Sequence, residues 1–417
     1  MLKILSMILV CLFASAMLAV PASASEKVNI EMWHAMKAEK NDALESLVNR
    51  FMKENPDISV TTKLIKSPDP KMYGNDYACL YRNIIQGLAG GTPPDIAQVY
   101  ENWTTQFVMI GAVTPFSHFK GADAITQAEI NDIFPSFRNA CSFNGDMYAM
   151  PFNKSIYVMY YNKALFSKLG INPPKTWEEV KAVSKKIYES EGIPGLEFTP
   201  SVDIFGNILY TSGGEFIRNG SAVFNDAKGI AAMNYLREMT ENNYAAYSYS
   251  SYKDFVGGKA GFIIETTSRI GALKNDCKFN YGITFVPGEK KAYLYAGTNL
   301  AIFSQDEAKK LASWKLIRFL NRKENNIELA ERTGYLPTTL SASESPEYKK
   351  FISSNPGYET GIQALKYGVS QPDTAAWESI RGFITDAVMN SLAEGQDAEE
   401  AVNAAAEYSN DLLKGFK

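Results

Sequence analysis

The amino-acid sequence predicts an α/β protein of two units that are joined by several chain crossings. Strands and helices alternate from about residue 28, which is typical of a mostly parallel sheet covered by helices. The alternation starts again after residue 173, and no repeat or low-complexity linker separates the two parts. With 417 residues, 46% apolar and 21% charged, the chain can build two or three domains with large cores.

The first unit begins with a strand and an amphipathic helix. Residues 28–32 alternate apolar and polar side chains, which predicts a strand. The apolar residues from Leu44 to Phe51 recur at helical spacing, and Asn55-Pro56 ends that helix. The rest of the unit is predicted as a strand (58–65), a helix (75–89) that stops at Gly-Gly-Thr-Pro-Pro, and a strand (95–100) followed by Glu101.

The segment MPFNKSIYVMYYNK, Met150–Lys163, has the large apolar residues of a buried strand. Its first positions, Pro151 to Ser155, nevertheless include an amide, an ammonium and a hydroxyl group. Tyr157, Tyr160 and Tyr161 are expected to pack in a core, whereas the polar cluster before them is a candidate for contact with a ligand.

The second unit restarts the pattern with a capped helix. Thr176 is expected to be the N-cap of a helix, with Glu179 three residues later closing a capping box. Strands are predicted at 262–264 and 281–286, and one long helix over 308–332 that ends at Gly334. The tail over 397–413 is amphipathic, with one apolar face formed by Ala401, Ala405, Tyr408 and Leu412.

The N-terminus has the pattern of a cleaved secretory signal peptide, residues 1–24. Lys3 gives a basic start, residues 4–20 are almost wholly apolar, and small residues precede Ser25. The apolar stretch is short for a membrane anchor, since a span needs about 20 residues. Lipidation at Cys11 is a weaker alternative because bulky Val10 precedes it. We therefore expect a protein secreted to the periplasm or the cell exterior.

The charge and cysteine content exclude several classes of partner. Cleavage before Ser25 removes one lysine and no carboxylate, so the formal net charge changes from −4 to −5. This weak acidity argues against nucleic acid and anionic membrane surfaces as partners. Cys79, Cys141 and Cys277 are an odd, sparse set that forms no disulfide framework, and none is spaced like a zinc ligand. No metal or cofactor is expected.

Sequence motifs for catalysis are missing, although carboxylates are plentiful. The chain has only two histidines, His34 and His118, and contains no P-loop, HExxH or GxSxG motif. A pair of carboxylates of the glycosidase type stays open. Glu101 is the best candidate acid, because ligands of α/β sheets gather at the carboxyl ends of strands. The plain alternative for Glu101 is a surface position near a helix N-cap.

Four separated motifs resemble one family, the extracellular solute-binding components of bacterial ABC importers. They are MWHAM (Met32–Met36), IAQVYE (Ile96–Glu101), PFNKSIYVMYYNK with PPKTWEE (Pro151–Lys163 and Pro173–Glu179), and TGYLPTT (Thr333–Thr339). The similarity runs from about residue 28 to the C-terminus. PPKTWEE and YNK are shared by many sugar binders of this class, while QVYE, PFN-x-S and TGYLP together resemble the glycerol-3-phosphate-binding branch.

The resemblance implies a two-lobed periplasmic-binding-protein fold with three interlobe crossings. Residues 25–150 with 288–335 would form lobe 1, and residues 151–287 with 336–417 lobe 2. It also implies a monomer that captures sn-glycerol-3-phosphate, or a glycerophosphodiester, between the lobes and delivers it to a membrane permease without chemistry. The matching ligand-contact positions are Tyr77, Glu101, Ser155, Thr266, Gly297, Tyr335 and Arg381.

The chemistry of these positions fits a small anionic polyol. An arginine such as Arg381 can hold two phosphate oxygens in a planar fork. The hydroxyl groups of Ser155 and Thr266 can serve the remaining oxygens; the family has serine where this chain has Thr266. Glu101 would repel phosphate, so it is expected at the glycerol hydroxyls. Lys154 replaces a small polar residue of the family, which is expected to strengthen anion binding.

Structural roles without ligand contact also fit these residues. Arg381 could be a solvated helix charge, Tyr335 could pack at the helix end, and Gly297 could mark a bulge. His34, Trp103 and Trp377 flank the same regions and could line the cleft or simply pack.

Two other functions fit the same sequence. One is an oligosaccharide-binding protein on the same scaffold, which would use more tryptophan platforms and would not need Arg381. The other is a secreted hydrolase of phosphodiesters or glycosides, against which the lack of a metal-ligand cluster weighs.

Overall fold

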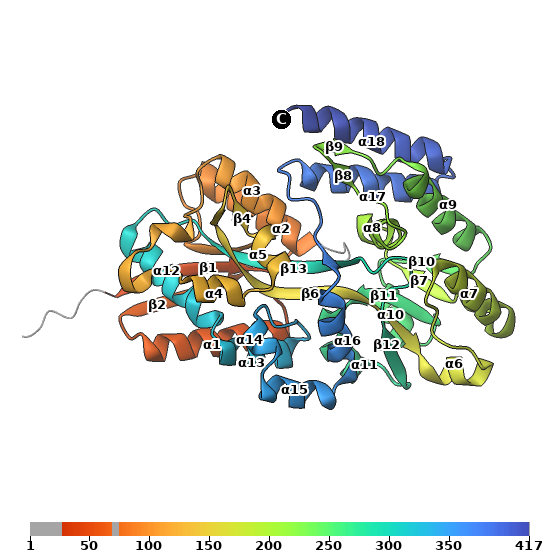
Figure 1. Ribbon diagram of the computed structural model, residues 1–417, viewed down its shortest axis with the longest axis horizontal. Helices are drawn as coiled ribbons and strands as arrows, with labels where there is room; N and C mark the ends of the chain where they lie inside the picture. Colours follow the sequence, from red (N-terminus) through yellow and green to blue (C-terminus); the bar gives the residue numbers. More distant parts are fainter. Residues whose placement is uncertain (1–26, 69–74, 417) are drawn as a thin grey trace, which may run out of the picture.

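The computed structural model of the chain describes residues 27–68 and 75–416. The predicted signal peptide, residues 1–24, lies outside these ranges. Within them the chain forms one ten-stranded sheet surrounded by helices, together with two small ribbons of two strands (Figure 1). None of the helices in the described ranges is long and apolar enough to cross a membrane.

The large sheet has the strand order β10-β7-β11-β6-β13-β3-β1-β2, with β12 beside β6 and β14 beside β13. The strands are β1 (Val28–His34), β2 (Ile58–Leu64), β3 (Ile96–Val99), β4 (Ser142–Phe143), β5 (Asp146–Met147), β6 (Ala149–Asn162), β7 (Leu196–Phe198), β8 (Ile217–Arg218), β9 (Ser221–Ala222), β10 (Ala245–Tyr247), β11 (Phe262–Thr266), β12 (Tyr281–Thr284), β13 (Tyr293–Ile302) and β14 (Gly368–Val369).

Along the main path of the sheet, parallel pairing occurs at the two ends and antiparallel pairing in the middle, while the short strand β14 lies parallel to β13. β2, β1 and β3 are parallel at one end, and β10, β7 and β11 are parallel at the other. The long strands β6 and β13 run antiparallel to each other and connect the two groups across the centre (Figure 1). The predicted α/β class is therefore confirmed, with a parallel group for each unit.

Helices flank both parallel groups. The α-helices are α1 (Glu39–Glu54), α2 (Asn75–Ala89), α3 (Glu101–Met109), α4 (Gln127–Asp132), α5 (Pro135–Ala140), α6 (Lys163–Leu169), α7 (Trp177–Glu191), α8 (Val202–Thr211), α9 (Ala227–Glu241), α10 (Ser251–Val256), α11 (Ile270–Asp276), α12 (Glu307–Leu320), α13 (Lys323–Thr333), α14 (Leu340–Ser343), α15 (Pro346–Ser353), α16 (Pro356–Leu365), α17 (Trp377–Ala393) and α18 (Ala398–Lys414). Three short 3₁₀ helices are η1 (Phe116–His118), η2 (Gly121–Asp123) and η3 (Thr267–Arg269). α9, α17 and α18 pack together above the β7–β10–β11 end (Figure 1).

The predicted cap of α7 is half confirmed. The Thr176 side chain accepts a hydrogen bond from the Glu179 backbone N–H at 3.2 Å, as expected for an N-cap. The Glu179 carboxylate, however, accepts from the backbone N–H of Lys175 at 2.6 Å instead of closing the box on Thr176. The reciprocal half of the capping box was therefore wrong by one residue.

The single long helix predicted over 308–332 is wrong, because the structure has two helices there. α12 ends at Leu320 and α13 begins at Lys323. At the break, the Asn325 side-chain amide donates to the Phe319 carbonyl at 2.6 Å, and Arg322 has extended backbone angles. Asparagine side chains compete with the helix for backbone groups in this way. Gly334 ends α13 in a left-handed conformation, as predicted.

The apolar face predicted for the C-terminal tail is correct except at Tyr408. Ala401 and Ala405 are buried in α18, whereas Tyr408 is 62% exposed and touches only the edge of Phe383. Ser409 occupies the buried position next to it and donates a hydrogen bond to the Ala405 carbonyl at 2.6 Å. The buried position is thus taken by a small side chain whose hydroxyl group is satisfied within the helix.

Strand β6 is buried along twelve consecutive residues, Ala149–Tyr160. Beside it lie the other two segments for which the resemblance implies crossings. β13 pairs with β6 from Ala149 to Ile156, and Leu336 forms a bridge to Lys154 on the other edge, with its N–H donating to the Lys154 carbonyl at 2.7 Å. Three distant segments thus meet at one point of the sheet.

Gly297 allows β13 to approach β6 closely at this point. Its φ is +104°, and a Cβ atom placed on it would lie 2.0 Å from the Asn153 carbonyl oxygen. Any side chain would therefore be strained in its backbone and would also clash with the neighbouring strand.

We predict that Gly297→Ala lowers the free energy of unfolding by about 2–4 kcal/mol, because both the backbone conformation and the strand contact must change. Urea-induced unfolding measures the loss. Gly382→Ala in α17 is the matched control, since a Cβ there meets nothing within 4 Å. That control should gain up to about 1 kcal/mol from helix propensity. Equal effects of the two substitutions would contradict the strand-contact argument.

Candidate functional site

The seven residues predicted to contact a ligand come from seven elements around the centre of the sheet. They are Tyr77 in α2, Glu101 at the start of α3, Ser155 in β6, Thr266 at the end of β11, Gly297 in β13, Tyr335 after α13 and Arg381 in α17. Contacts with β6 and its neighbouring strands connect several of them.

Three tyrosines form a row beside the crossing. The rings of Tyr77 and Tyr100 have centroids 5.3 Å apart, and the phenol groups of Tyr77 and Tyr335 interact with each other. Burial raises the pKa of all three hydroxyl groups, so they stay neutral hydrogen-bonding groups at physiological pH. Tyr77 and Tyr335 are thus brought together as predicted, and the sequence analysis missed Tyr100.

Asn153 fixes this row against the sheet. Its side-chain oxygen accepts hydrogen bonds from Gln98 at 3.1 Å and from the backbone N–H of Thr298 at 3.2 Å. The side chain also lies near the phenols of Tyr77 and Tyr335 and opposes the rise of their pKa, but its NH₂ group forms no hydrogen bond within the described residues. Ser155 lies two residues further along β6 and therefore on the same face of the sheet. The polar cluster at the start of β6 thus includes a buried structural amide next to a candidate ligand hydroxyl.

Lys154 points to the opposite face, where it pairs with Glu101. Its ammonium group is fully buried, lies 2.5 Å from Glu101 Oε1, and is close to the rings of Phe137 and Tyr295. Asn299 donates to the same carboxylate oxygen at 3.3 Å. The charge of Lys154 is thus paired away from Ser155, and its expected effect on anion binding stays a prediction. Glu101 is not a simple surface residue.

Arg381 is held beside the tyrosine row by groups from three elements. Its guanidinium donates to the Gln371 side chain and lies 3.7 Å from Asp203 Oδ2 in α8. Burial by itself lowers the pKa of Arg381, but Asp203 and Glu378 outweigh it and raise the pKa, so the group stays charged. The same charge acts on the hydroxyl groups of Tyr100 and Tyr157. Arg381 is therefore no solvated helix charge.

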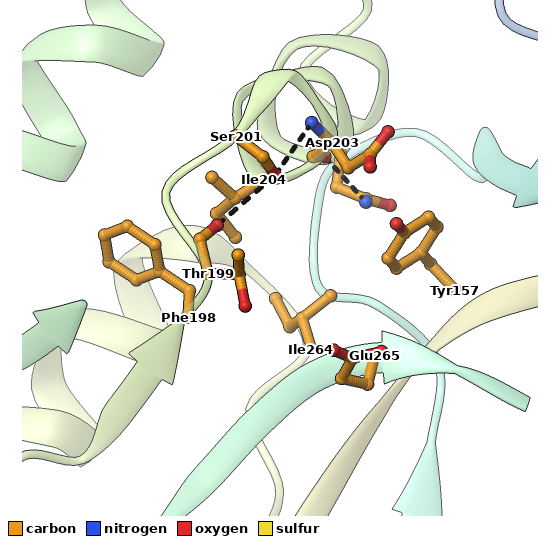
Figure 2. A pocket seen from close by; sticks show the side chains of 9 residues that line it. Tyr157, Phe198, Thr199, Ser201, Asp203, Ile204, Ile264 and Glu265 are labelled. Atoms are coloured by element: carbon orange, nitrogen blue, oxygen red, sulfur yellow. Dashed lines mark hydrogen bonds between the residues drawn. The ribbon is translucent and has the colours of Figure 1, made fainter. Parts of the chain in front are cut away.

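Thr266 ends strand β11 opposite Tyr157, which lies two residues after Ser155 in β6. Its hydroxyl group forms a 2.8 Å hydrogen bond with Ser268. Figure 2 shows Tyr157 and Asp203 at the edge of a cavity that also adjoins Glu265. The cavity volume is about 20 Å³, which is room for roughly one water molecule, so a ligand needs the surrounding elements to separate.

A larger hollow of about 370 Å³ lies elsewhere, on the surface beside the end of β6. It is lined by Tyr161, Lys163, Ala164, Phe166, Ser167, Ile171, Asn172, Pro173 and Asn280. None of the predicted ligand residues belongs to it. Its size alone therefore gives no reason to move the candidate site.

His34, Trp103 and Trp377 are buried and pack in the core. The two indoles also support the surroundings of Arg381. Trp377 donates to Gln371 at 2.9 Å, and Trp103 donates to Glu378 at 2.9 Å. Trp103 and Trp377 therefore contribute to the site through packing and orientation, whereas His34 packs in the core.

The sequence analysis missed Tyr157 and Asp203 as neighbours of Arg381. Tyr157 is buried in the core as expected, and the period of two also places it on the same face of β6 as Ser155. Asp203 follows Ser201, whose side chain accepts from the Asp203 backbone N–H at 3.3 Å and begins α8. No sequence motif pointed to Asp203, because its contact with Arg381 spans 178 positions of the chain.

Comparison with known proteins identifies the family. Residues 47–360 match the family described as bacterial extracellular solute-binding protein. The sn-glycerol-3-phosphate-binding periplasmic protein UgpB of Escherichia coli (strain K12) is 27% identical over 438 residues, which covers 96% of this chain and 96% of that protein.

Solved structures share the fold. UgpB from Mycobacterium tuberculosis, in complex with glycerophosphocholine, superposes with a TM-score of 0.84 at 21% identity and covers 93% of this chain and 99% of that one. The GacH receptor of Streptomyces glaucescens, solved unliganded and with acarbose, gives a TM-score of 0.83 at 21% identity and covers 94% and 100%. The two-lobed periplasmic-binding-protein fold implied by the resemblance is thereby confirmed.

We predict that Lys154→Met destabilises the protein by about 3–5 kcal/mol, because it leaves the Glu101 carboxylate without its buried partner. The double variant Lys154→Met/Glu101→Gln should be more stable than Lys154→Met alone, since neither charge remains. Urea-induced unfolding of Lys154→Met, Glu101→Gln and the double variant, with Lys53→Met on the surface as control, measures the coupling. Simple addition of the two single effects would contradict the pairing.

We also predict a loss of stability in acid that depends on His34. Burial lowers the pKa of His34 from 6.5 to about 4. The unfolded chain therefore takes up the proton first, so the His34 contribution is complete above pH 6.5 and is lost as the pH falls toward 4, by about 3 kcal/mol in total. Unfolding at pH 7 and pH 4.5 should show a smaller difference for His34→Gln than for the wild type; equal differences would contradict this assignment.

Proposed function

The chain belongs to the family of bacterial extracellular solute-binding proteins and is the substrate-binding component of an ABC importer, and from this premise we propose that its ligand is sn-glycerol-3-phosphate or a glycerophosphodiester. Proteins of this family act outside the cytoplasm. The ligand is proposed from the site and from two relatives. One is named for binding sn-glycerol-3-phosphate, and the other was solved in complex with glycerophosphocholine.

The observation that carries the proposal is the position of Arg381. A charged, partly buried guanidinium lies beside Tyr100 and Tyr157 at the centre of the molecule, where a neutral sugar would have no need of it. It can hold two phosphate oxygens at once, provided that the phosphate displaces its contacts with Gln371 and Asp203.

The other predicted residues take complementary roles in this proposal. The hydroxyl groups of Ser155 and Thr266 donate to the remaining phosphate oxygens. Lys154 and Asn299 both use Oε1 of Glu101, which leaves Oε2 to accept from a glycerol hydroxyl. This role requires the carboxylate to turn from the face of β6 that it shares with Lys154 toward the face of Ser155. Tyr77 and Tyr335 offer ring faces and hydroxyl groups to the glycerol. Gly297 takes part indirectly in this proposal, because the space that its Cβ atom would fill is taken by the β6 backbone at Asn153, which lets the two central strands lie close together.

Closure of two lobes is proposed to enclose the ligand. The proposed lobes are residues 25–150 with 288–335, and residues 151–287 with 336–417. The chain would bend where β6, β13 and the segment at Leu336 lie side by side, and the ligand would shift an open–closed equilibrium. The closed monomer then docks on the membrane permease of the importer.

A neutral oligosaccharide is the second candidate ligand, because the GacH receptor with the same fold was solved with acarbose. On this scaffold such a ligand would not depend on Arg381. A secreted hydrolase is the alternative from another class, and product formation from excess glycerophosphodiester over hours would support it.

We predict that sn-glycerol-3-phosphate and glycerophosphocholine raise the melting temperature. Ligand at about 100 times its Kd stabilises the folded state by about 2.7 kcal/mol. Arg381→Ala should abolish this rise, and Arg381→Lys should restore only part of it, because an ammonium lacks the planar fork. Thermal unfolding, read against the unliganded midpoint of each variant, measures the effect.

Arg332→Ala, on the exposed side of α13, is the control and should respond like the wild type. Maltose and acarbose serve as neutral ligands in the same measurement. A response of Arg381→Ala equal to that of the wild type would remove Arg381 from the site. A rise with the sugars alone would replace the proposed ligand by an oligosaccharide.

A further inference from the structure

The tyrosine row has a second cation at the end that lies away from Arg381. The Lys40 ammonium, from the first turn of α1, lies 4.8 Å from the centroid of the Tyr335 ring. Lys40 is partly buried, and within the described residues it forms no ion pair with a carboxylate. A partly buried ammonium that contacts an aromatic ring and has no carboxylate at ion-pair distance is poorly compensated.

Arg269 adds positive charge to the same place. It ends η3, three residues after Thr266, and its charge acts on both Lys40 and Tyr335. Its Nε atom is 3.6 Å from Glu265 Oε2, and its guanidinium lies over the ring of Tyr252. Two cations from distant parts of the chain therefore act at one predicted ligand residue, Lys40 by contact with the Tyr335 ring and Arg269 through its charge.

The three tyrosines connect the two positively charged ends by successive contacts. Lys40 contacts Tyr335, Tyr335 interacts with Tyr77, Tyr77 packs on Tyr100, and the Arg381 charge acts on Tyr100. A ligand that lies along the three rings thus meets a cation at each end. If the phosphate binds Arg381, the opposite end is suited to a second negative group.

We propose that Lys40 and Arg269 bind a second anionic group of the ligand, so that the cleft prefers glycerophosphodiesters whose headgroup carries its own negative charge. This rests on the proposed function, in which Arg381 holds the phosphate. A carboxylate at this end accepts charge-assisted hydrogen bonds from both side chains and relieves the repulsion between them.

The charged groups around Lys40 give the preference a dependence on pH. Burial, and then the charge of Arg269, lower the pKa of Lys40 to about 8, while Glu39 and Glu265 act in the opposite direction. Tyr335 and Tyr77 stay neutral because burial raises their pKa. Above pH 8 the ammonium loses its proton, so the preference for a second anion falls between pH 7 and pH 9.

The test compares two ligands that differ by one carboxylate, sn-glycero-3-phospho-L-serine and sn-glycero-3-phosphoethanolamine, with sn-glycerol-3-phosphate as reference. Isothermal titration calorimetry at pH 7 should show that the wild type binds the serine diester at least about tenfold more tightly than the ethanolamine diester. Lys40→Met should remove this preference and leave the Kd of the other two ligands within about twofold. Lys40→Arg should keep it at both pH 7 and pH 9, unlike the wild type.

Lys53→Met, exposed on the same helix, is the matched control and should keep the wild-type preference. Equal affinity of the wild type for the two diesters overturns the second anion subsite alone. An equal loss of affinity for all three ligands in Lys40→Met does the same. Failure of the wild type to bind any of the three ligands overturns the proposed function and this inference together.

Discussion

The backbone hydrogen bonds on both edges of β6 are the constraint on which the rest of the structure depends. β13 pairs with one edge and Leu336 with the other, and the strand is buried on both faces. No water reaches the polar groups of such a strand, so each of them needs a partner inside the protein. Asn153 finds Gln98 and Thr298 on one face, and Lys154 finds Glu101 on the other. A shift of register by one residue would exchange the two faces and leave both side chains without partners.

Local patterns in the sequence were sufficient to predict most of the helices and strands. Period-two alternation, helical spacing, the Thr176 cap and the Gly334 stop act within a few residues, and the structure has strands and helices where they predict them. The failures have local physical causes as well. Asn325 caps a helix end that spacing alone reads as continuous, and the buried position in α18 is taken by Ser409 instead of Tyr408.

The site was predictable in part, and only through the motifs shared with a known family. Those motifs identified candidate residues, but they did not indicate which charged side chains form ion pairs with one another. The pair between Lys154 and Glu101 joins residues 53 positions apart, and Asp203 approaches Arg381 across a much larger separation. Such contacts arise from packing of the sheet and helices, and no periodicity encodes them. The result is a centre with few unpaired charges, where a ligand anion must compete with Asp203 for the guanidinium of Arg381.

The hydrogen bond from Trp103 to Glu378 makes the fluorescence of Trp103 sensitive to the contact between α3 and α17. It connects α3 with α17, and its acceptor is a carboxylate one helical turn from Arg381. Opening of the proposed lobes separates this donor from its acceptor and lets water reach the indole. The emission of a tryptophan depends on charge and water around its ring, so the fluorescence of the unlabelled protein reports the conformational equilibrium directly.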